Sequence, residues 1–481
     1  MQNREVSGLL FNSWQFAIFF PLVFALYWRL PHRYRIGLLL IASYYFYMSW
    51  SVKYVALILF TTIVSYASAL LITKTHSLRA KKAILIVSLV ACLGVLFVFK
   101  YFNFFTGAVV DFLSLFTIRL HPMTLKLLLP VGISFYTFQT LGYVIDVYRG
   151  NTQPERNFWV YATFISFFPQ LVAGPIERTN NLLPQIKAVH EFNYPQAVYG
   201  VKLMAWGFFK KLCVADILAF YVVDMVFSDI YRYKGLELLI AVFFFTIQIY
   251  CDFSGYSDIA RGCAKMLGID LMENFKSPYF SASLREFWSR WHISLSTWFR
   301  DYVYIPLGGS RCGKFRHNMN LLLTFTISGL WHGANWTFLL WGMLHGLGQV
   351  VENTLTRRKT QELHGVVWAV RVLVTFMFVM LGWIFFRAQT LSEAVYIIRS
   401  IFSGINGRVY FFEFSGLRKT ASVLCIIMLM LWDYFSLKHD VIAEITSCMS
   451  SVIRYSFYFL LLTLLLLLRA LAPVEFVYFQ F

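Results

Sequence analysis

Runs of about twenty apolar residues recur along the whole chain, and this recurrence limits which folds the sequence can adopt. The clearest runs lie at 9–28, 54–73, 83–99, 236–251, 367–386 and 453–472, and weaker ones lie at 36–50, 127–148, 157–173, 199–228, 335–352 and 421–437. A helix needs roughly 20 such residues to cross a bilayer, so we expect about ten to thirteen embedded helices. Lipid cannot satisfy the edge hydrogen bonds of an open sheet, so the sequence predicts an all-α polytopic membrane protein.

The composition agrees with one membrane domain over residues 1–481. Of these residues, 59% are hydrophobic and only 14% are charged, against about 25% charged residues in soluble domains. No internal repeat, low-complexity tract or long linker interrupts the chain. We therefore expect a single helical bundle.

The net charge of +18 could indicate a nucleic-acid-binding protein, but the distribution of the cations argues against it. Lysine and arginine gather in four short loops: Arg29, Arg33 and Arg35; Lys74, Arg79, Lys81 and Lys82; Arg311, Lys314 and Arg316; and Arg357, Arg358 and Lys359. Such clusters beside apolar runs are typical of the cytoplasmic loops of membrane proteins. We expect contact with membrane lipid, no nucleic-acid partner, and an N-terminus on the outer face.

The seven cysteines give no evidence for a metal site or a disulfide framework. They are scattered at positions 92, 213, 251, 263, 312, 425 and 448, without the paired spacing of zinc ligands. We expect them to pack in membrane helices, and we expect neither a bound metal nor a tightly bound cofactor.

Two histidines stand in aromatic and glycine-rich surroundings. His292 follows the string Phe-Trp-Ser-Arg-Trp, and His332 is preceded by Trp331 and followed by Gly-Ala-Asn335. A charged side chain at membrane depth costs about 2.5–3.5 kcal/mol on insertion scales, so an ionisable residue there is a functional-site hypothesis. A lone buried histidine is usually a packing residue. Two such histidines, linked by a basic segment, favour a catalytic role.

Polar residues inside the apolar sequence form a second constellation. Gln248, Asp252 and Tyr256 follow one another at helical spacing and share a face of the predicted helix. Another apolar run ends at Gly174-Pro175, a break that membranes tolerate only where the backbone is buried in protein or lines a watery cavity. Interhelical hydrogen bonding would explain some of these residues. Several such sites in one chain favour a polar tunnel.

The segment 274–320 is amphipathic, and its apolar residues recur at the three- and four-residue spacing of one helix. These residues are Leu284, Phe287, Trp288, Trp291 and Leu295, and the cations of the segment include Arg285, Arg290 and Arg300. A helix with this pattern lies in the membrane interface, and a surface anchor is its simplest role. The three arginines could also form a cytoplasmic vestibule for a polyphosphorylated ligand.

Four strings in the chain are long and specific. They are Asp252-Phe-Ser-Gly-Tyr-Ser-Asp, Met272-Glu-Asn-Phe-Lys-Ser-Pro-Tyr, Glu286-Phe-Trp-Ser-Arg-Trp-His-Ile-Ser-Leu-Ser-Thr-Trp-Phe-Arg-Asp-Tyr and Leu330-Trp-His-Gly-Ala-Asn. These strings resemble the membrane-bound O-acyltransferase family, in its bacterial branch for alginate and peptidoglycan O-acetylation. The resemblance extends over most of the chain.

The resemblance implies a helical bundle around a tunnel from the cytoplasm to the outer face. It places the family's essential histidine at His332 and a second active-site position at His292, and we expect Trp331 and Asn335 to line the tunnel or its vestibule. The chain gives one independent indication of depth. Residues 318–331 would form a helix of about 21 Å, shorter than a hydrocarbon core of about 30 Å, and residues 335–352 could return to the same side.

The implied reaction is acyl transfer from the thioester of acetyl-CoA, which is a substrate and not a bound cofactor. A neutral His332 could act as general base on the acceptor hydroxyl, and burial favours the neutral imidazole. His292 could orient His332, stabilise the oxyanion or share a proton relay, and the sequence leaves these roles open. We expect His317 to be interfacial and His345 to be a packing residue.

The resemblance also implies an acceptor and a partner. We expect a subunit in the bacterial cytoplasmic (inner) membrane that serves the O-acetylation of an envelope polysaccharide or exopolysaccharide, of alginate or peptidoglycan type. An extracytoplasmic SGNH-like acetyltransferase would complete the transfer. The alternatives are a transporter or flippase for a polysaccharide or lipid-linked saccharide, and a non-catalytic scaffold. A transporter does not need the histidine pair, and no inverted repeat is visible.

The last six residues, 476–481, read Phe-Val-Tyr478-Phe-Gln-Phe. An aromatic belt at the membrane interface would explain them. The Phe-x-Tyr-x-x-Phe ending also resembles the carboxy-terminal motif of the small peptide that accompanies the D-alanyl exporter of teichoic acids, whose tyrosine is thought to carry the acyl group. A phenol oxygen can act as a nucleophile, so Tyr478 is a candidate for a covalent relay.

Overall fold

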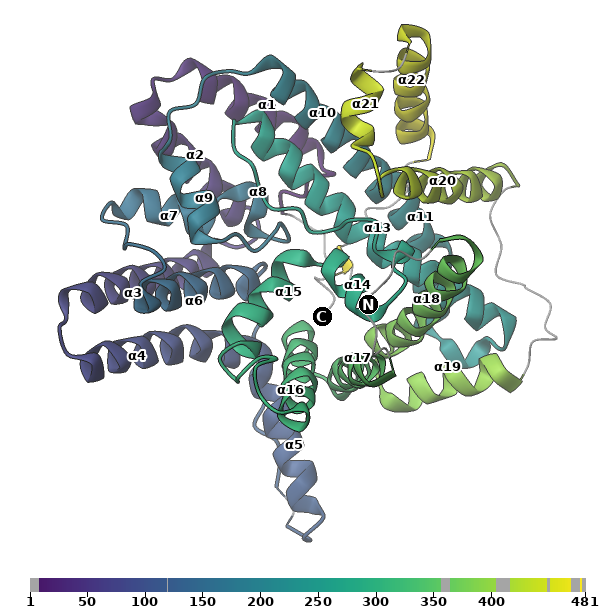
Figure 1. Ribbon diagram of the computed structural model, residues 1–481, viewed down its shortest axis with the longest axis horizontal. Helices are drawn as coiled ribbons and strands as arrows, with labels where there is room; N and C mark the ends of the chain where they lie inside the picture. The colour runs from purple at the N-terminus through teal and green to yellow at the C-terminus, as the bar shows by residue number, and fades with distance from the viewer. Residues whose placement is uncertain are drawn as a thin grey trace. The chain divides into compact units, whose positions relative to one another are not determined.

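The computed structural model describes residues 8–118, 120–355, 364–403, 416–447, 450–468 and 476–477 (Figure 1). All regular elements in these residues are helices, which confirms the predicted all-α class. Three parts of the sequence analysis lie outside the described residues: the basic cluster at 357–359, Cys448 and the relay candidate Tyr478.

Four helical segments in the described residues are long and apolar enough to cross a membrane. They are Val52–Lys74, Leu78–Ser114, Leu236–Met266 and Gly365–Arg387, and two shorter apolar helices are Thr420–Phe435 and Ser451–Leu467. Each of the six coincides with an apolar run in the sequence. These helices support a multi-pass membrane protein, while the number of ten to thirteen embedded helices stays a prediction.

The described chain separates into two compact units. The first contains residues 1–201 and 260–272, and the second contains residues 202–259 and 273–481. Two helices, α10 (Tyr194–Phe208) and α13 (Leu236–Met266), contribute residues to both units. The single domain expected from the sequence stays a prediction.

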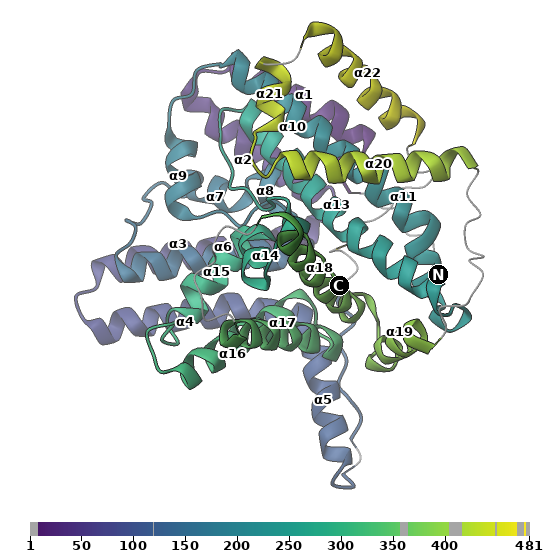
Figure 2. The same ribbon diagram turned by 45° about the vertical axis from the view of Figure 1, so that its right-hand side comes forward.

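The first unit is a bundle of helices with hydrogen-bonded polar groups in its interior. Its helices are α1 (Trp14–Arg29), α2 (His32–Met48), α3 (Val55–Lys74), α4 (Leu78–Leu96), α5 (Phe102–Ser114), α6 (Ile133–Arg149), α7 (Phe158–Ser166), α8 (Phe168–Leu171) and α9 (Thr179–Lys187). Helices α3, α4 and α6 lie side by side (Figures 1 and 2). The hydroxyls of Ser65 and Tyr161 lie 2.6 Å apart in this bundle, because buried polar groups need partners.

The ends of helices in the first unit follow local capping rules. Ser13 caps the N-terminus of α1, and its Oγ accepts a hydrogen bond from the N–H of Phe16 at 3.2 Å. Helix α6 ends at Arg149 and is followed by the cap residue Gly150, whose φ of 77° is left-handed. The next N–H, of Asn151, donates to the carbonyl of Asp146 at 2.9 Å. Glycine adopts this conformation at low cost, so the sequence itself determines where α6 ends.

The second unit contains the two histidines and a large aromatic core. Its other helices are α11 (Asp216–Leu218), α12 (Asp224–Ser228), α14 (Leu284–Arg290), α15 (Ile293–Phe299), α16 (Lys314–His332), α17 (Trp336–Leu355), α18 (Gly365–Arg387), α19 (Leu391–Ser403), α20 (Gly416–Phe435), α21 (Val441–Ser447) and α22 (Ser451–Leu467). The ring centroids of Trp291 and Trp383 lie 4.9 Å apart, and those of Trp341 and Trp383 lie 5.8 Å apart. These tryptophans join α17 and α18 to the chain just before His292.

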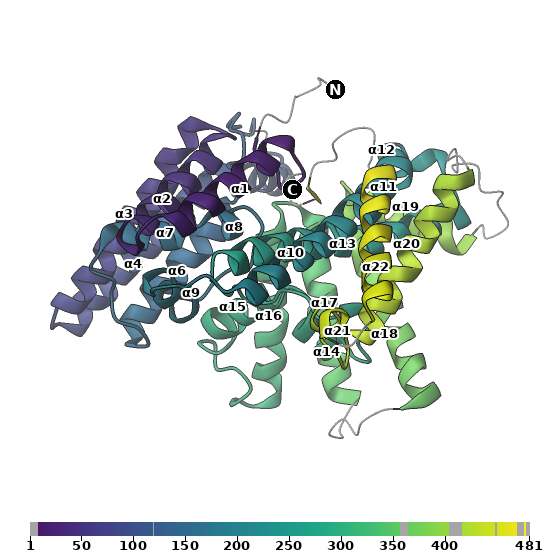
Figure 3. The same cartoon turned by 90° about the horizontal axis from the view of Figure 1, so that it is seen from above.

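Helices α16 and α17 form a closely packed hairpin (Figures 1 and 3). A Cβ atom added at Gly342 would lie 2.3 Å from the carbonyl oxygen of Phe325, and one added at Gly329 would lie 2.2 Å from that of Phe338. Only glycine permits this approach of two helices. The hairpin agrees with the predicted reversal of the chain after His332.

The amphipathic segment differs from its prediction. The expected single helix through residues 284–295 is wrong, because α14 ends at Arg290 and α15 begins at Ile293. The apolar spacing continues across this break, so periodicity could not reveal it. Phe287 and Trp291 are each only 1% exposed and pack in the aromatic core of the second unit. This apolar face therefore covers protein, in contrast to the lipid-facing helix that was expected.

Candidate active site

His292 lies at the break between α14 and α15. Its backbone is left-handed, with φ 43° and ψ 55°, a conformation that non-glycine residues adopt rarely and most often at functional sites. Asn274 holds the chain beyond the break: its carbonyl accepts from the N–H of Ile293 at 3.0 Å, and its Oδ1 accepts from the N–H of Ser294 at 3.2 Å. The strained backbone of His292 is thus maintained by a residue from the preceding loop.

The side chain of His292 is buried among aromatic rings. Its ring centroid lies 4.6 Å from that of Phe253, with the planes nearly perpendicular, and 6.4 Å from that of Phe275, with the planes nearly parallel. His292 lies outside the candidate membrane spans. Burial in this apolar environment lowers the pKa of His292 from 6.5 to about 3. The imidazole is therefore neutral at pH 7, because desolvation penalises the imidazolium.

His332 is the last residue of α16 and is 3% exposed. Its ring centroid lies 4.9 Å from that of Trp331, 5.0 Å from that of Trp341 and 5.4 Å from that of Phe386. The helix has 19 residues and is about 28 Å long at 1.5 Å per residue. It begins at Lys314, earlier than expected, so its length alone does not place His332 part-way through the bilayer.

The two histidines come together although 39 residues of sequence separate them. Their ring centroids lie 6.4 Å apart, and the centroids of His292 and Trp331 lie 6.1 Å apart. The structure therefore brings three of the predicted site residues into one aromatic enclosure. A neutral imidazole in such an enclosure can accept a proton from a bound hydroxyl.

The predicted polar face of α13 lies inside the protein. Gln248, Asp252 and Tyr256 are 3%, 1% and 5% exposed. One carboxylate oxygen of Asp252 forms an ion pair with Lys211 at 2.6 Å, and the other accepts a hydrogen bond from the N–H of Val477 at 2.7 Å. Asp252 thus has protein partners on both oxygens. The role of this face in lining a tunnel stays a prediction.

The three predicted vestibule arginines differ in their surroundings. Arg290 forms an ion pair with Glu286 at 2.6 Å, and Arg300 forms one with Asp301 at 2.8 Å. Such pairs at partly exposed positions are weak and can exchange partners. Arg285 lines a large cavity of the second unit instead. A shared vestibule formed by the three arginines therefore stays a prediction.

The large cavity beside α14 has a volume of about 1040 Å³. The residues that line it include cations, one carboxylate and aromatic rings: Arg285, Glu286, Trp368, Tyr434, Lys438 and His439. Ligand pockets in proteins typically measure about 300–1000 Å³. The cavity is therefore large enough for a ligand with a nucleotide moiety.

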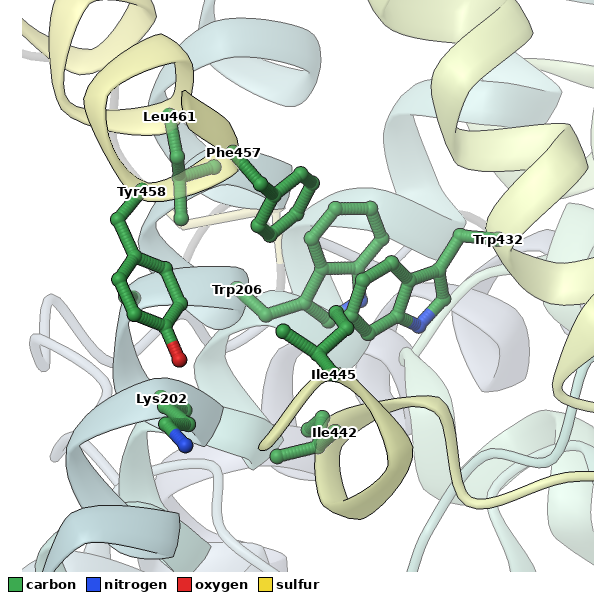
Figure 4. Close-up of a pocket in the computed structure, with 9 residues that line it drawn as sticks. Lys202, Trp206, Trp432, Ile442, Ile445, Phe457, Tyr458 and Leu461 are labelled. Atoms are coloured by element: carbon green, nitrogen blue, oxygen red, sulfur yellow. The ribbon is translucent and has the colours of Figure 1, made fainter. Parts of the chain in front are cut away.

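A second cavity lies among the helices near the end of the chain and is much smaller. Figure 4 shows its rings: Trp206 and Trp432 stack with centroids 3.9 Å apart, and Phe457 stacks on Trp432 at 6.0 Å. Lys202 lines the same cavity, with its Nζ 5.8 Å from the ring centre of Tyr458. The volume of about 40 Å³ has room for a few water molecules at most, so this cavity is not a substrate site.

The remaining polar candidates have structural partners. Asn335 donates from Nδ2 to the carbonyl of Gln389 at 2.8 Å, and its Oδ1 accepts from the N–H of Thr337 at 3.1 Å at the start of α17. The Nδ1 of His317 lies 2.8 Å from the hydroxyl of Tyr304. His345 is fully buried against the rings of Phe287, Trp288 and Trp341. Within the described residues, no group of His, Cys, Asp and Glu side chains could hold a metal ion.

The chain is similar to known proteins over most of its length. A model of the membrane-bound O-acyltransferase family matches residues 156–392. A probable alginate O-acetylase of Pseudomonas putida is 41% identical over 390 residues, which cover 80% of this chain and 78% of that protein. The chain belongs to the membrane-bound O-acyltransferase family.

More distant members of the family extend the similarity. The peptidoglycan O-acetyltransferase of Helicobacter pylori is 36% identical over 398 residues, covering 77% of this chain and 74% of that protein. The teichoic acid D-alanyltransferase of Bacillus subtilis is 28% identical over 272 residues, covering 54% and 69%. The protein is thus an acyltransferase, and the resemblance that its motifs indicated is confirmed. The transporter alternative has no support.

Sequence reasoning missed two residues that support predicted site residues, one beside His292 and one beside Asp252. Asn274 maintains the backbone of His292, and Lys211 lies between the carboxylates of Asp216 and Asp252 at 2.8 and 2.6 Å. A signal for the second was available. Lys210 and Lys211 stand inside an apolar run, where a lysine requires a carboxylate partner. The sequence gives no such signal for Asn274, because its hydrogen bonds to residues 293 and 294 form only when the loop before α14 is folded.

Proposed function

We propose that this acyltransferase is the membrane acetyltransferase subunit of a bacterial system that O-acetylates an envelope polysaccharide or exopolysaccharide. It lies in the cytoplasmic (inner) membrane, takes acetyl groups from cytoplasmic acetyl-CoA, and serves an acceptor of alginate or peptidoglycan type. The observation that carries the proposal is the aromatic enclosure in which the centroids of His292 and His332 lie 6.4 Å apart. The names of the relatives, which are O-acetylases and O-acetyltransferases, support the choice of acetyl.

The proposed reaction uses His332 as the base. Its neutral imidazole removes the proton of the acceptor hydroxyl as the oxygen attacks the thioester carbonyl. The tetrahedral intermediate collapses, the C–S bond breaks, and the CoA thiolate takes the proton from the imidazolium. The products are the acetyl ester and CoA with a free thiol. His332 then returns to its neutral form.

The large cavity beside α14 is the proposed docking site for the nucleotide portion of acetyl-CoA. Arg285 and Lys438 supply positive charge for its phosphates, and Trp368 and Tyr434 supply faces for the adenine ring. Glu286 also lines the cavity and would repel phosphate, but its charge is offset by Arg290 at 2.6 Å. Arg290 and Arg300 stay predicted contributors to the same electrostatic field.

The proposed acceptor of the first transfer is the phenol of Tyr478. A phenyl acetate is an activated ester, so transfer from it to a serine nucleophile is favourable. An extracytoplasmic SGNH-like acetyltransferase would take the acetyl group from this relay and pass it to the polysaccharide. The substitution Tyr478→Phe keeps the aromatic ring and removes only the hydroxyl. We expect loss of polymer acetylation in this variant, and full acetylation would exclude the relay.

The function is tested with purified protein and acetyl-CoA labelled in the acetyl group. We expect release of CoA together with label on the protein or on an added acceptor, and neither in His332→Ala. Movement of intact substrate into vesicles without release of CoA would contradict the proposal, because an acyltransferase must break the thioester bond.

A further inference from the structure

A cluster of three charged residues is buried beside the catalytic enclosure and has no part in the proposed chemistry. The Nζ of Lys211 lies 2.8 Å from Oδ1 of Asp216 and 2.6 Å from Oδ1 of Asp252. These three residues are 5%, 2% and 1% exposed. One lysine against two aspartates leaves one net negative charge. A buried charge of this kind is costly unless further hydrogen bonds offset it.

A further hydrogen bond to this cluster comes from the backbone of residue 477. The backbone N–H of Val477 donates to Oδ2 of Asp252 at 2.7 Å, across 225 positions of sequence. The two carboxylate oxygens of Asp252 thus have different functions: one pairs with Lys211 and the other receives the chain. A hydrogen bond to an ionised acceptor is about twice as strong as a neutral one.

Aromatic contacts hold the same segment against α13. The ring of Phe476 lies 5.0 Å from that of Tyr256 and 5.8 Å from that of Phe253. Phe476 and Val477 are 1% and 2% exposed, so both are fully packed. Phe253 also contacts His292, at a centroid distance of 4.6 Å. The ring of Phe253 therefore contacts both Phe476 and the candidate catalytic histidine.

We propose that Asp252 is the docking residue for the carboxy-terminal tail, with Lys211 and Asp216 orienting its carboxylate. Asp252 binds the backbone of the tail, and Phe253 and Tyr256 bind the side chain of Phe476. Asp252 is a positioning residue in this arrangement, because it acts on the tail and not on the acetyl group. The anchor itself is independent of the relay, whereas its effect on acetyl transfer rests on the proposed function of the following residue, Tyr478.

The anchor is tested by amide hydrogen exchange of the tail in the full-length protein. We expect Asp252→Ala to accelerate exchange at residues 476 and 477 by about tenfold or more, as loss of a hydrogen bond to a charged group requires. The matched control is Asp258→Asn, which removes another carboxylate of α13, one that pairs with Lys210 at 2.6 Å. Exchange in this control should stay at the wild-type rate. Equal tail exchange in Asp252→Ala and the wild type would overturn the anchor.

A second pair of variants leaves the charged cluster intact and therefore serves if Asp252→Ala does not fold. Val477→Pro removes the N–H, and Val477→Ala shortens the side chain but keeps the N–H. We expect Val477→Pro to reduce polymer acetylation by about tenfold or more relative to Val477→Ala. Hydrolysis of acetyl-CoA, in which water replaces the acceptor, needs only the donor and the two histidines. The rate of CoA release by hydrolysis should therefore be equal in the two variants. Equal polymer acetylation would overturn the positioning role.

Amide exchange of the tail tests the anchor, and polymer acetylation in Tyr478→Phe tests the relay, so the two can fail independently. Fast tail exchange in Asp252→Ala with full acetylation in Tyr478→Phe would support the anchor and reject the relay. Slow exchange in Asp252→Ala with loss of acetylation in Tyr478→Phe would reject the anchor and support the relay.

Discussion

The ring centroids of His292 and His332 lie 6.4 Å apart, and their planes are inclined by 56°. Two imidazoles joined by a direct N–H···N hydrogen bond would lie closer, because their nitrogens must approach within about 3.2 Å. This separation excludes a direct hydrogen bond between the two imidazoles. Of the three roles that the sequence left open for His292, direct orientation of His332 is therefore disfavoured. Stabilisation of an oxyanion, or a proton relay through a bound group, fits the distance.

His332→Ala should abolish acetyl transfer while the protein still inserts in the membrane. Loss of a general base typically lowers the rate about 10²–10⁴-fold. CoA release by the purified variant measures the effect. The matched control is His317→Gln on the same helix, whose histidine contacts Tyr304 outside the enclosure. Near-normal CoA release by His332→Ala would reject the assignment.

His292→Asn should retain more activity than His292→Ala. An asparagine can still donate or accept a hydrogen bond in the enclosure, whereas alanine leaves a void beside Phe253. The left-handed backbone at this position also favours asparagine, which tolerates positive φ better than alanine does. The turnover rates of the two variants, measured at saturating acetyl-CoA, provide the test. Equal rates would argue against a hydrogen-bonding role for His292.

The stability of the protein should depend on pH through His292. Its pKa is about 3 in the folded protein and 6.5 in the reference state, so between these values only the unfolded chain binds the proton. Stability therefore falls as the pH is lowered from 6.5 towards 3, by at most about 1.4 kcal/mol per pH unit from this group. Thermal unfolding in detergent at pH 7.5 and 5 measures the effect.

The comparison protein for this measurement is His292→Gln, which cannot titrate. All other histidines contribute equally to both proteins, so the difference between their pH profiles belongs to His292. We expect the melting temperature of the wild type to fall more steeply on acidification. Parallel profiles would show that the imidazole is not excluded from water in the folded protein.

The sequence predicted the helices well and the break at His292 not at all. Runs of about twenty apolar residues mark segments that can cross a membrane, and they located the six apolar helices. The short apolar segment before His332 predicted the reversal of the chain that the α16–α17 hairpin makes. The pattern of Leu284, Phe287, Trp288, Trp291 and Leu295 continues through the break. The break depends on hydrogen bonds from Asn274, which is a tertiary contact and leaves no periodic signal.

The sequence predicted the two histidines of the candidate site but not the contacts made by the polar residues near them. His292 and His332 were recognisable because ionisable side chains in apolar sequence are costly and rare. The partners of Asp252 were not, because its bond to Val477 joins positions 225 residues apart. Helical spacing placed Asp252 on a face with Gln248 and Tyr256, but it could not show that the carboxylate holds protein groups on both oxygens.

Gly342→Ala should weaken the hairpin that ends at His332. The added Cβ would lie 2.3 Å from the carbonyl oxygen of Phe325, so α16 and α17 must move apart. Overpacking of this kind costs about 1–3 kcal/mol, and the movement should also displace His332. The control is Gly313→Ala before the same helix, where an added Cβ meets nothing within 4 Å. Equal melting temperatures for the two variants would contradict the close packing.

Arg285→Gln should weaken the binding of acetyl-CoA more than it slows the bound reaction. Arg285 lines the 1040 Å³ cavity, and loss of a charge-assisted hydrogen bond to phosphate lowers affinity by about tenfold or more. Arg300→Gln should have a smaller effect, because that guanidinium is paired with Asp301 at 2.8 Å and is not among the residues described as lining the cavity. Replacing Arg285, Arg290 and Arg300 together should weaken binding further through the loss of positive potential.

Equilibrium binding of acetyl-CoA to the detergent-solubilised variants distinguishes this docking site from a general cationic surface. A docking cavity requires that Arg285→Gln exceeds Arg300→Gln in effect, because both side chains are exposed but of these two described residues only Arg285 lines the cavity. Equal effects that both vanish in high salt would show that the arginines act only through long-range charge. Unchanged affinity in all the variants would mean that they stabilise the segment through Glu286 and Asp301 and take no part in donor binding.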